Sequence, residues 1–437
     1  MKRDAVQATT TLALMLLAVS ATGQTPRVKL ELVGALPVPE GSVAHAVAVA
    51  GNRLCVAWVT EFNGDIAPQI DGGIDVVDVT DTSHPHTLGR CSIEDWTPTA
   101  VQLVGDYAYV PASGPFSPCP IVGYLACLGH QTKGCLGWRP DVGFNVIDLS
   151  TPTAPFKRTD TPYRCAADVR DMVVAGQHLY VLHFDRLTVL SLAEPARPVA
   201  VGELALNRPA RALCVSAGVS GGGTCAFITY DGLDGPGFSP GGIRMVSLAE
   251  PTRPSEDYDG YLAGTARAID EGGGHVVICV DGRVLVIGVG LLRAGFVQDF
   301  RGYAYDVQIV EHLAYVSDWE RAVVVVDIST EPPSVVGRFA TEGRVHTLQV
   351  VDDYAFVAAG EQGLLILKIT EVPAITRTER TAEGLLLQWN DAAKGMTLQR
   401  ATDLTNPDWQ DLVGSQNTNL FTRPFWGGSE FFRLIMR

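Results

Sequence analysis

Short apolar stretches that alternate with polar residues recur along most of this chain. Gly, Asn, Asp and Pro stand between them, and two neighbouring stretches are separated by only a few residues. This period of two, broken by turn-forming residues, indicates strands joined by tight turns and not helices. We therefore expect an all-β protein.

The stretches group into a repeating unit with two halves. The first half is an apolar strand, a tight polar turn and a second apolar strand. Clear copies read AVAVAGNRLCVAW from Ala46, AVQLVGDYAYVPA from Ala100, DMVVAGQHLYVLH from Asp171, DVQIVEHLAYVSD from Asp306 and TLQVVDDYAFVAA from Thr347, and weaker ones begin at Ala212 and Ala268.

The second half is a strand, a turn that contains proline, and a closing strand. Its copies read GGIDVVDVTDTSHPHTLGR from Gly72, GFNVIDLSTPTAPFKR from Gly143, RLTVLSLAEPARPVAVGEL from Arg186, GGIRMVSLAEPTRP from Gly241, AVVVVDISTEPPSVVGRF from Ala322 and, degenerate, RVLVIGVGLLRAGFV from Arg283. A seventh copy, GLLILKITEVP from Gly363, keeps its strand but has no closing strand after it.

Four short strands per unit, at a period of roughly 38–41 residues, match the blade of a β-propeller. The units number seven. A stack of sheets must be capped or closed into a ring, because open faces expose apolar surface. The segment Lys29 to Val38, KLELVGALPV, carries the same strand-then-VG pattern as PVAVGEL and PSVVGRF. We predict that it closes the seventh blade from the N-terminus; an edge strand on an open solenoid is the alternative.

The units resemble the LVIVD-repeat family. The segments that carry the likeness are VVDVTDTSHPHTLG, NVIDLSTPTAP, TVLSLAEPARPVAVG, VVVVDISTEPPSVVG and LLILKIT. The unit from Ala268 departs most, because it lacks the Asp-x-Ser/Thr turn and the prolines. The resemblance implies a β-propeller and an exported or surface-attached microbial protein, and it implies little about chemistry.

Both ends of the chain differ from the repeats. Residues 1–23 have a basic start, a short apolar core and small residues before Gln24, which is typical of a secretory signal peptide. We expect the propeller over residues 28–373 and a small β-sandwich-like module over 374–437, whose Trp and Phe side chains either fill its core or serve attachment. No segment is apolar for long enough to predict a transmembrane anchor. The location is then secreted, periplasmic or on the cell surface.

The formal net charge is −15, which disfavours nucleic acid as a partner. Exported proteins often carry disulfides, and the nine cysteines show no metal-binding spacing, so we expect no metal site. The candidate bridges are Cys214 with Cys225, on strands expected to be adjacent, and Cys119 with Cys135. Buried free thiols are the alternative, which we favour for Cys55 and Cys279.

Two features point to one end of the propeller. Long insertions fall between the second and third strands of three units, at Glu61–Gly72, Ala112–Asp141 and Asp231–Gly241, and such loops commonly carry function. At the same end, the first strand of each unit begins with a residue that we expect to line the channel mouth: His45, Thr99, Arg170, Arg211, Arg267, Tyr305 and His346.

Such a ring is suited to a carboxylate, phosphate or sulfate group. Asp171 and Asp306, next in the chain, offer the alternative of salt bridges between blades, since buried Arg is normally paired. We favour a non-catalytic exported scaffold that holds a protein, glycan or small anionic ligand. A propeller lactonase, lyase or hydrolase acting at the mouth is the alternative, although no catalytic motif or cofactor fingerprint is present, and we expect no cofactor. The sequence leaves the oligomeric state open.

Overall fold

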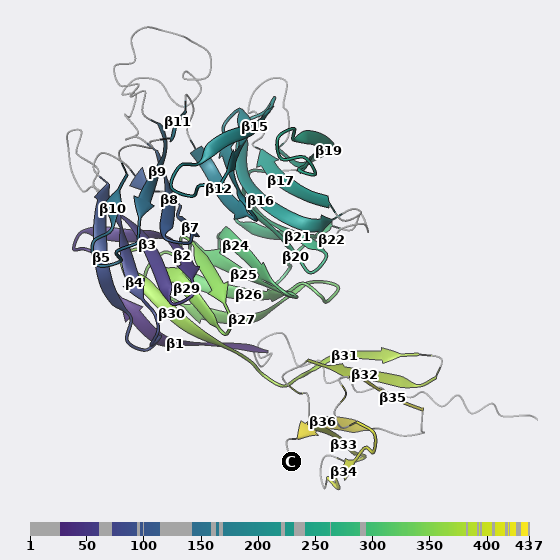
Figure 1. The fold of residues 1–437 in the computed structure, drawn as a ribbon. Helices are drawn as coiled ribbons and strands as arrows, with labels where there is room; N and C mark the ends of the chain where they lie inside the picture. Colours follow the sequence, from purple (N-terminus) through teal and green to yellow (C-terminus); the bar gives the residue numbers. More distant parts are fainter. Residues whose placement is uncertain are drawn as a thin grey trace, which may run out of the picture. The chain divides into compact units, whose positions relative to one another are not determined.

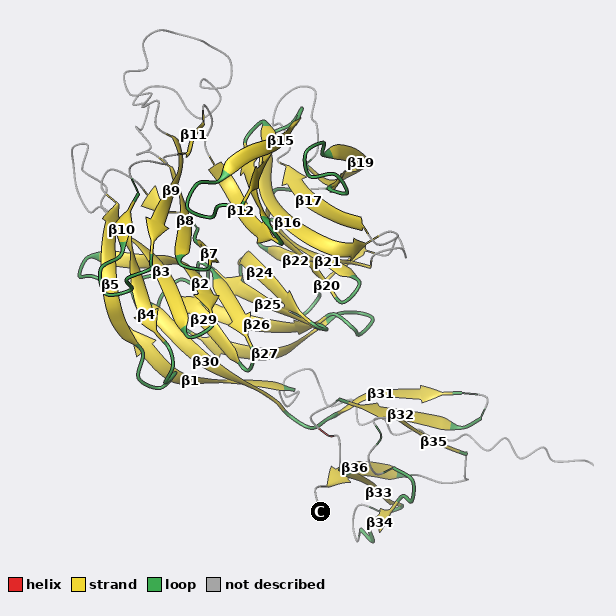
Figure 2. Ribbon diagram, in the orientation of Figure 1, coloured by secondary structure: helices red, strands yellow, loops and turns green. Residues whose placement is uncertain are grey.

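The structure, a computed structural model, describes most of the chain from Arg27 onward. The described residues are 27–60, 72–93, 97–98, 100–113, 142–158, 163–165, 169–219, 223–230, 241–262, 264–288, 294–381, 383–390, 393, 396–403, 407–415, 418, 420–424 and 430–435. They form strands and turns (Figures 1 and 2), and none of them belongs to a helix long and apolar enough to cross a membrane. The chain divides into two compact units, one of residues 30–369 and the other containing residues 370–437.

The larger unit consists of antiparallel sheets that each use strands close together in the sequence. The strands of the first three sheets are β2 (Ser42–Ala50), β3 (Arg53–Thr60), β4 (Gly72–Asp78) and β5 (His86–Ile93); β6 (Thr97–Pro98), β7 (Gln102–Val104), β8 (Tyr107–Ser113), β9 (Val142–Asp148), β10 (Phe156–Lys157) and β11 (Tyr163–Cys165); and β12 (Val169–Ala175), β13 (His178–His183), β14 (Arg186–Ser191) and β15 (Val199–Ala205).

The next three sheets repeat the same order. They are β16 (Ala210–Val219), β17 (Gly223–Tyr230), β18 (Gly242–Ser247) and β19 (Ser255–Tyr261); β20 (Ala266–Gly272), β21 (His275–Val280), β22 (Arg283–Gly288) and β23 (Ala294–Phe296); and β24 (Ala304–Val310), β25 (Leu313–Asp318), β26 (Ala322–Asp327) and β27 (Ser334–Ala340).

The last sheet joins the two ends of the larger unit. Its order is β28 (Leu348–Val351), β29 (Tyr354–Ala358), β30 (Leu364–Glu371) and then β1 (Val28–Leu36), so the N-terminal strand is its outermost member. The pairing of β1 with β30 is the one predicted for Lys29 to Val38.

The first strand of each sheet faces the middle of the larger unit. Figure 1 shows β2, β7, β12, β16 and β24 close to that middle. Contacts join β2 to β7, β7 to β12, β12 to β16, β16 to β20, β20 to β24, β24 to β28 and β28 to β2. The hydrophobic clusters lie between neighbouring sheets; one of them, for example, packs Val277 and Val286 against Val316 and Val324. Apolar burial between sheets is therefore what holds this unit together.

Glycines in three outermost strands allow a second contact between sheets. A Cβ atom added to Gly34 of β1 would lie 2.0 Å from the carbonyl oxygen of Thr82. At Gly89 of β5 the same atom would lie 2.4 Å from the oxygen of Pro152, and at Gly202 of β15 it would lie 2.2 Å from that of Pro251. Each carbonyl belongs to the proline-containing turn of the following sheet. The glycine of the recurring Val-Gly pair therefore packs against the recurring proline-containing turn of the next sheet. The strand β1 makes this contact in the same way as β5 and β15.

Polar side chains on the first strands join the sheets near the middle. The carboxylate of Asp171 accepts the amide of Leu213 at 2.8 Å, and that of Asp270 accepts the amide of Ile309 at 2.6 Å. Asp306 accepts the amide of Leu348 in the same way. Neutral side chains continue the pattern: Thr347 accepts from Val47, Gln308 from Val350 and Gln349 from Val49. Each bond satisfies a backbone donor of the following sheet that would otherwise be unpaired.

The three carboxyl groups of this network are partly buried. Burial is the main cause that raises the pKa of Asp171 to about 6, of Asp270 to about 6 and of Asp306 to about 7, against the opposing effect of the amides that they accept. Charges of the other carboxylates add to the rise at Asp306.

Five described cysteines are free thiols, and all of them are buried: Cys55, Cys91, Cys214, Cys225 and Cys279. The predicted Cys214–Cys225 bridge is not formed. Cys214 lies opposite Phe227 and Cys225 opposite Ser216, so the two residues are offset along adjacent strands, and both pack in one hydrophobic cluster. Cys119 and Cys135 lie outside the described residues.

The smaller unit contains two three-stranded sheets. One has the order β31 (Ile375–Arg380), β32 (Leu385–Trp389) and β35 (Leu420–Arg423), and the other has β34 (Gln410–Asp411), β33 (Thr397–Ala401) and β36 (Phe431–Ile435). The core combines both sheets: Leu387 and Trp389 of β32 cluster with Leu398 of β33 and Leu412. Trp389 is 1% exposed, so this aromatic residue fills the core.

Replacing Gly202 by Ala should lower stability although it reduces the conformational freedom of the unfolded chain, because the new Cβ atom would overlap the Pro251 carbonyl. We expect a loss of about 2 kcal/mol or more in the free energy of unfolding. Gly34→Ala should have a similar effect if β1 makes the same contact. Gly295→Ala is the matched control, since nothing lies within 4 Å of a Cβ atom there. Equal stabilities of the three variants in denaturant titration would contradict the contact.

The buried carboxyl groups should make the protein less stable as the pH rises from about 4 to about 7. The folded state holds protons at pKa values of about 6 to 7, whereas an unfolded Asp loses its proton near pH 3.9, so rising pH favours the unfolded state in this window. Asp306→Asn should reduce the fall in melting temperature between pH 5 and pH 8, and exposed Asp353→Asn should not. A pH profile of Asp306→Asn identical to that of the natural protein would refute this assignment.

Candidate functional site

Five of the residues predicted to ring the channel mouth share one backbone position. The pairing between the first and second strand of their sheets slips by one residue at that position. The residues skipped by the pairing are His45, Arg170, Arg211, Arg267 and Tyr305. Each is therefore the extra residue of a β-bulge, a feature that redirects a side chain and is common beside functional sites.

His346 occupies the same position in the last sheet. Its amide donates to the carbonyl of Ala358, and the amide of Ala358 donates to the carbonyl of Thr347, so two residues again face one. Thr99 lies outside the described residues. Six described ring residues thus occupy the same position in their sheets, as predicted. At each of them, two residues of the first strand face one residue of the second.

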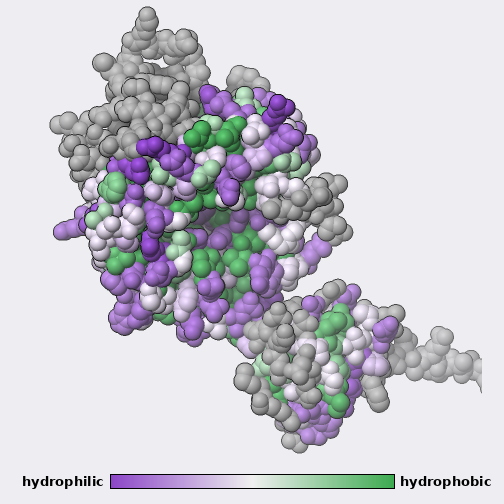
Figure 3. Space-filling model, viewed as in Figure 1, coloured by the Kyte–Doolittle hydropathy of each residue, from purple (hydrophilic) through white to green (hydrophobic). Residues whose placement is uncertain are grey.

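The insertions attach at the end of the sheets where these bulges lie. In a four-stranded antiparallel sheet, the start of the first strand and the connection from the second to the third strand lie at the same end. The chain leaves the described residues at Thr60, Ser113 and Tyr230, and it returns at Gly72, Val142 and Gly241. The rest of these insertions lies outside the described residues. We call this end the mouth; Figure 3 shows a hollow in the middle of the larger unit, seen from one side.

Arg170 and Arg267 are not paired with Asp171 or Asp306, the acids that follow two of the ring residues in the sequence. The carboxylates of Asp171 and Asp306 accept backbone amides instead. Among the described residues, no carboxylate forms an ion pair with Arg170 or Arg267. Arg170 lies 5.4 Å from the ring centre of Phe184. The alternative of salt bridges between blades is therefore not realised at these two arginines, which contact aromatic faces instead.

Aromatic rings hold two further guanidinium groups at the mouth. Arg267 lies 5.2 Å from the ring centre of Tyr305, Tyr305 stacks on Trp319 at 4.7 Å, and Arg344 lies 4.9 Å from the Trp319 ring. Arg267 comes from the sheet before these rings and Arg344 from the sheet after them. We call these four residues the cation–aromatic stack. Arg267 also donates its Nε–H to the hydroxyl group of Tyr303 at 3.4 Å. Stacking on a ring face does not use the other N–H donors in the plane of the guanidinium.

Two histidines extend the stack. The ring of His346 lies 4.8 Å from Trp319 and 4.6 Å from His45. His346 is 7% exposed, and its Nδ1 has no hydrogen-bond partner. Burial, and after it the neighbouring His45 and Arg344, lower the pKa of His346 to about 3. This imidazole is therefore neutral at physiological pH.

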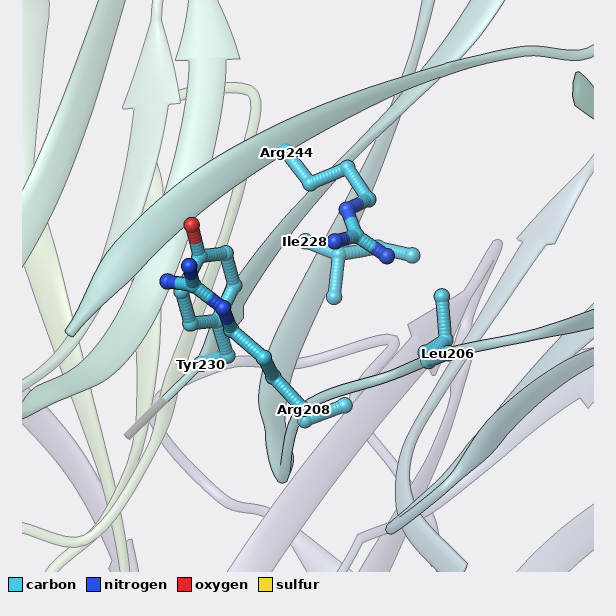
Figure 4. Close-up of a pocket in the computed structure, with 6 residues that line it drawn as sticks. Leu206, Arg208, Ile228, Tyr230 and Arg244 are labelled. Carbon is cyan, nitrogen blue, oxygen red and sulfur yellow. The ribbon is translucent and has the colours of Figure 1, made fainter. Parts of the chain in front are cut away.

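A second group of cations near the mouth is structural. Arg244 is fully buried and donates to Glu256 at 2.6 Å, to Asn207 at 2.7 Å and to Asp259 at 3.2 Å. Arg208 lies against the ring of Tyr230 at 4.8 Å (Figure 4). There is no room for a water molecule between these side chains. Both terminal nitrogens of Arg244 are used by acceptors of the protein itself, and its Nε is buried, so this side chain is not available to a ligand.

Sequence reasoning missed Trp319 and Arg344. It considered the first residue of each inner strand and the long insertions, whereas Trp319 lies in the short connection between β25 and β26, and Arg344 lies two residues before a ring position. Alignment of the repeats could have found Trp319, because it places this aromatic residue in a short turn at the mouth end.

Three segments of the chain match the LVIVD repeat family: residues 66–92, 301–341 and 342–371. No curated protein sequence matches the chain. Among solved structures, the WD40 domain of Neurospora crassa Pan2 superposes with a TM-score of 0.51 at 13% identity, covering 79% of this chain and 96% of that domain.

Two other solved structures are similar to a lesser degree. Saccharomyces cerevisiae Sqt1 has a TM-score of 0.47 at 8% identity and covers 79% of this chain and 99% of its own; the computationally designed Ika8 protein has 0.49 at 13% and covers 78% and 100%. The Pan2 likeness concerns the fold alone. Together with the matched segments and the sheets, it confirms the predicted resemblance to the LVIVD-repeat family: this chain carries LVIVD repeats in an all-β, propeller-like fold.

Proposed function

We propose that this chain is an exported, non-catalytic binding or scaffold protein that holds an anionic group at the mouth. The group belongs either to a small anion or to an acidic glycan or protein. The single observation that carries the proposal is the way in which Arg170 and Arg267 are held: by aromatic faces, with no ion pair to a described carboxylate.

The proposal also includes a more detailed description of the fold. The seven sheets of the larger unit are the blades of a closed seven-bladed propeller, with β1 as the closing strand of the seventh blade and a small β-sandwich-like module at the C-terminus. The contacts that join β28 to β2 support the closure, and so does the use of Gly34 in the role of Gly89 and Gly202. A rigid ring fixes the relative positions of side chains that come from different blades.

The proposal includes export, so that the protein binds its ligand outside the cytoplasm. The basic and apolar pattern of residues 1–23, which lie outside the described residues, supports export by a signal peptide. The net charge of the chain is −15, so the positively charged mouth differs from the rest of the protein. Anions are attracted to the mouth and repelled by the negatively charged surface around it.

Anions should stabilise the protein through the ring arginines. We expect sulfate and citrate to raise the melting temperature, because a ligand at a hundredfold excess over its Kd contributes about 2.7 kcal/mol to the folded state. The rise should be clearly smaller in Arg170→Gln and Arg267→Gln. Arg253→Gln is the matched control, since this exposed arginine lies in the turn between β18 and β19, at the opposite end of the sheets. Ionic strength is held constant with sodium chloride.

Equal anion-dependent shifts in all four proteins would show that the effect is a general salt effect and would refute binding at the ring.

A further inference from the structure

A pocket of about 170 Å³ lies beside the cation–aromatic stack. It is lined by Val43, Arg321, Glu342, Gly343, Arg344, His346, Gly360 and Glu361. One liquid water occupies about 30 Å³, so the space has room for roughly half a dozen waters. This volume fits a single small ring compound or one residue of a longer chain, and it is too small for a folded segment.

The pocket offers two guanidinium groups that the protein leaves uncommitted. Neither Arg321 nor Arg344 forms an ion pair with a described carboxylate, although Glu342 and Glu361 line the same pocket. Arg344 is positioned by stacking on Trp319, so its in-plane N–H donors remain for a ligand. A planar guanidinium recognises a carboxylate through two parallel hydrogen bonds.

The other polar groups of the pocket match hydroxyl groups. Glu342 and Glu361 accept hydrogen bonds, and the neutral imidazole of His346 has one donor and one acceptor nitrogen. A hydroxyl group donates and accepts, and can therefore use both kinds of partner, whereas an ammonium group only donates. A ligand that carries one carboxylate and several hydroxyls satisfies this set better than a zwitterion or an inorganic anion.

The shape of the pocket depends on two glycines. A Cβ atom at Gly360 would lie 3.8 Å from Nε2 of His346, and a Cβ atom at Gly343 would lie 2.2 Å from the carbonyl oxygen of Ala359. The absence of both side chains lets the segment before β28 pack closely on the turn between β29 and β30 and leaves open the space beside the imidazole.

We propose that this pocket binds one sugar-acid residue, with its carboxylate on Arg344 and Arg321 and its hydroxyls on Glu342, Glu361 and His346. The inference rests on the proposed function and specifies it: the anionic ligand of the mouth is a uronic acid or a glycan that contains one.

Calorimetric titration of the full chain with D-glucuronate tests this directly. We expect saturable binding to the natural protein, and at least about tenfold weaker binding to Arg344→Gln. Glucose should bind at least about tenfold more weakly than glucuronate, because it lacks the carboxylate. Arg253→Gln should bind glucuronate as the natural protein does, and the melting temperature of each variant checks that it is folded.

The inference is overturned if glucuronate binds Arg344→Gln and the natural protein equally, if glucose or alanine binds as well as glucuronate, or if glucuronate does not bind. In the last case, sulfate and citrate separate the two claims. Anion binding that depends on Arg267 but not on Arg344 would leave the proposed function standing without the sugar acid, and the failure of every anion to bind would remove both.

Discussion

The packing of the apolar sheet faces that hold the larger unit together depends on hydrogen bonds that cross from one sheet to the next near its middle. Carboxylates or amide groups on one inner strand accept backbone N–H groups of the following inner strand, as Asp171 does for Leu213 and Asp270 for Ile309. An inner strand has only one partner within its own sheet, so these donors need an acceptor from elsewhere. The bonds therefore fix how each inner strand lies against the next one, directly beside the bulged residues.

This arrangement links stability to the chemistry of the mouth. The acids on the same inner strands as Arg170, Arg267 and Tyr305 are occupied by backbone amides, and their burial raises their pKa values. Arg170 and Arg267 rest on aromatic faces instead, which hold their position without neutralising their charge. The contrast with Arg244, which has three acceptors of its own, distinguishes the cations that support the fold from those that remain for a ligand.

Much of the fold was predictable because the repeats carry local signals. Alternating apolar residues and Pro-containing turns located the strands, and the orphaned strand after Gly363 led to the pairing of β1 with β30. The ring residues were predictable as one position because every copy of the repeat starts its inner strand alike. The partners of those residues were not predictable, because Asp171 turns to Leu213 across a sheet boundary. For the same reason, local sequence does not show that Trp319 stacks on Tyr305 of its own sheet and contacts Arg344 and His346 of the next one. The Cys214–Cys225 prediction failed because strand adjacency does not specify register.

The most direct measurement is NMR of the arginine guanidinium groups with sulfate added stepwise. The account predicts that the signals of Arg170 and Arg267 show no ion pair in the ligand-free protein and shift as sulfate is added. The signals of Arg244 should show its ion pairs from the start and should not shift. Signals that show ion-paired Arg170 and Arg267 without any anion, or no response of these two to sulfate, would contradict the claim that the mouth holds its cations ready for a ligand.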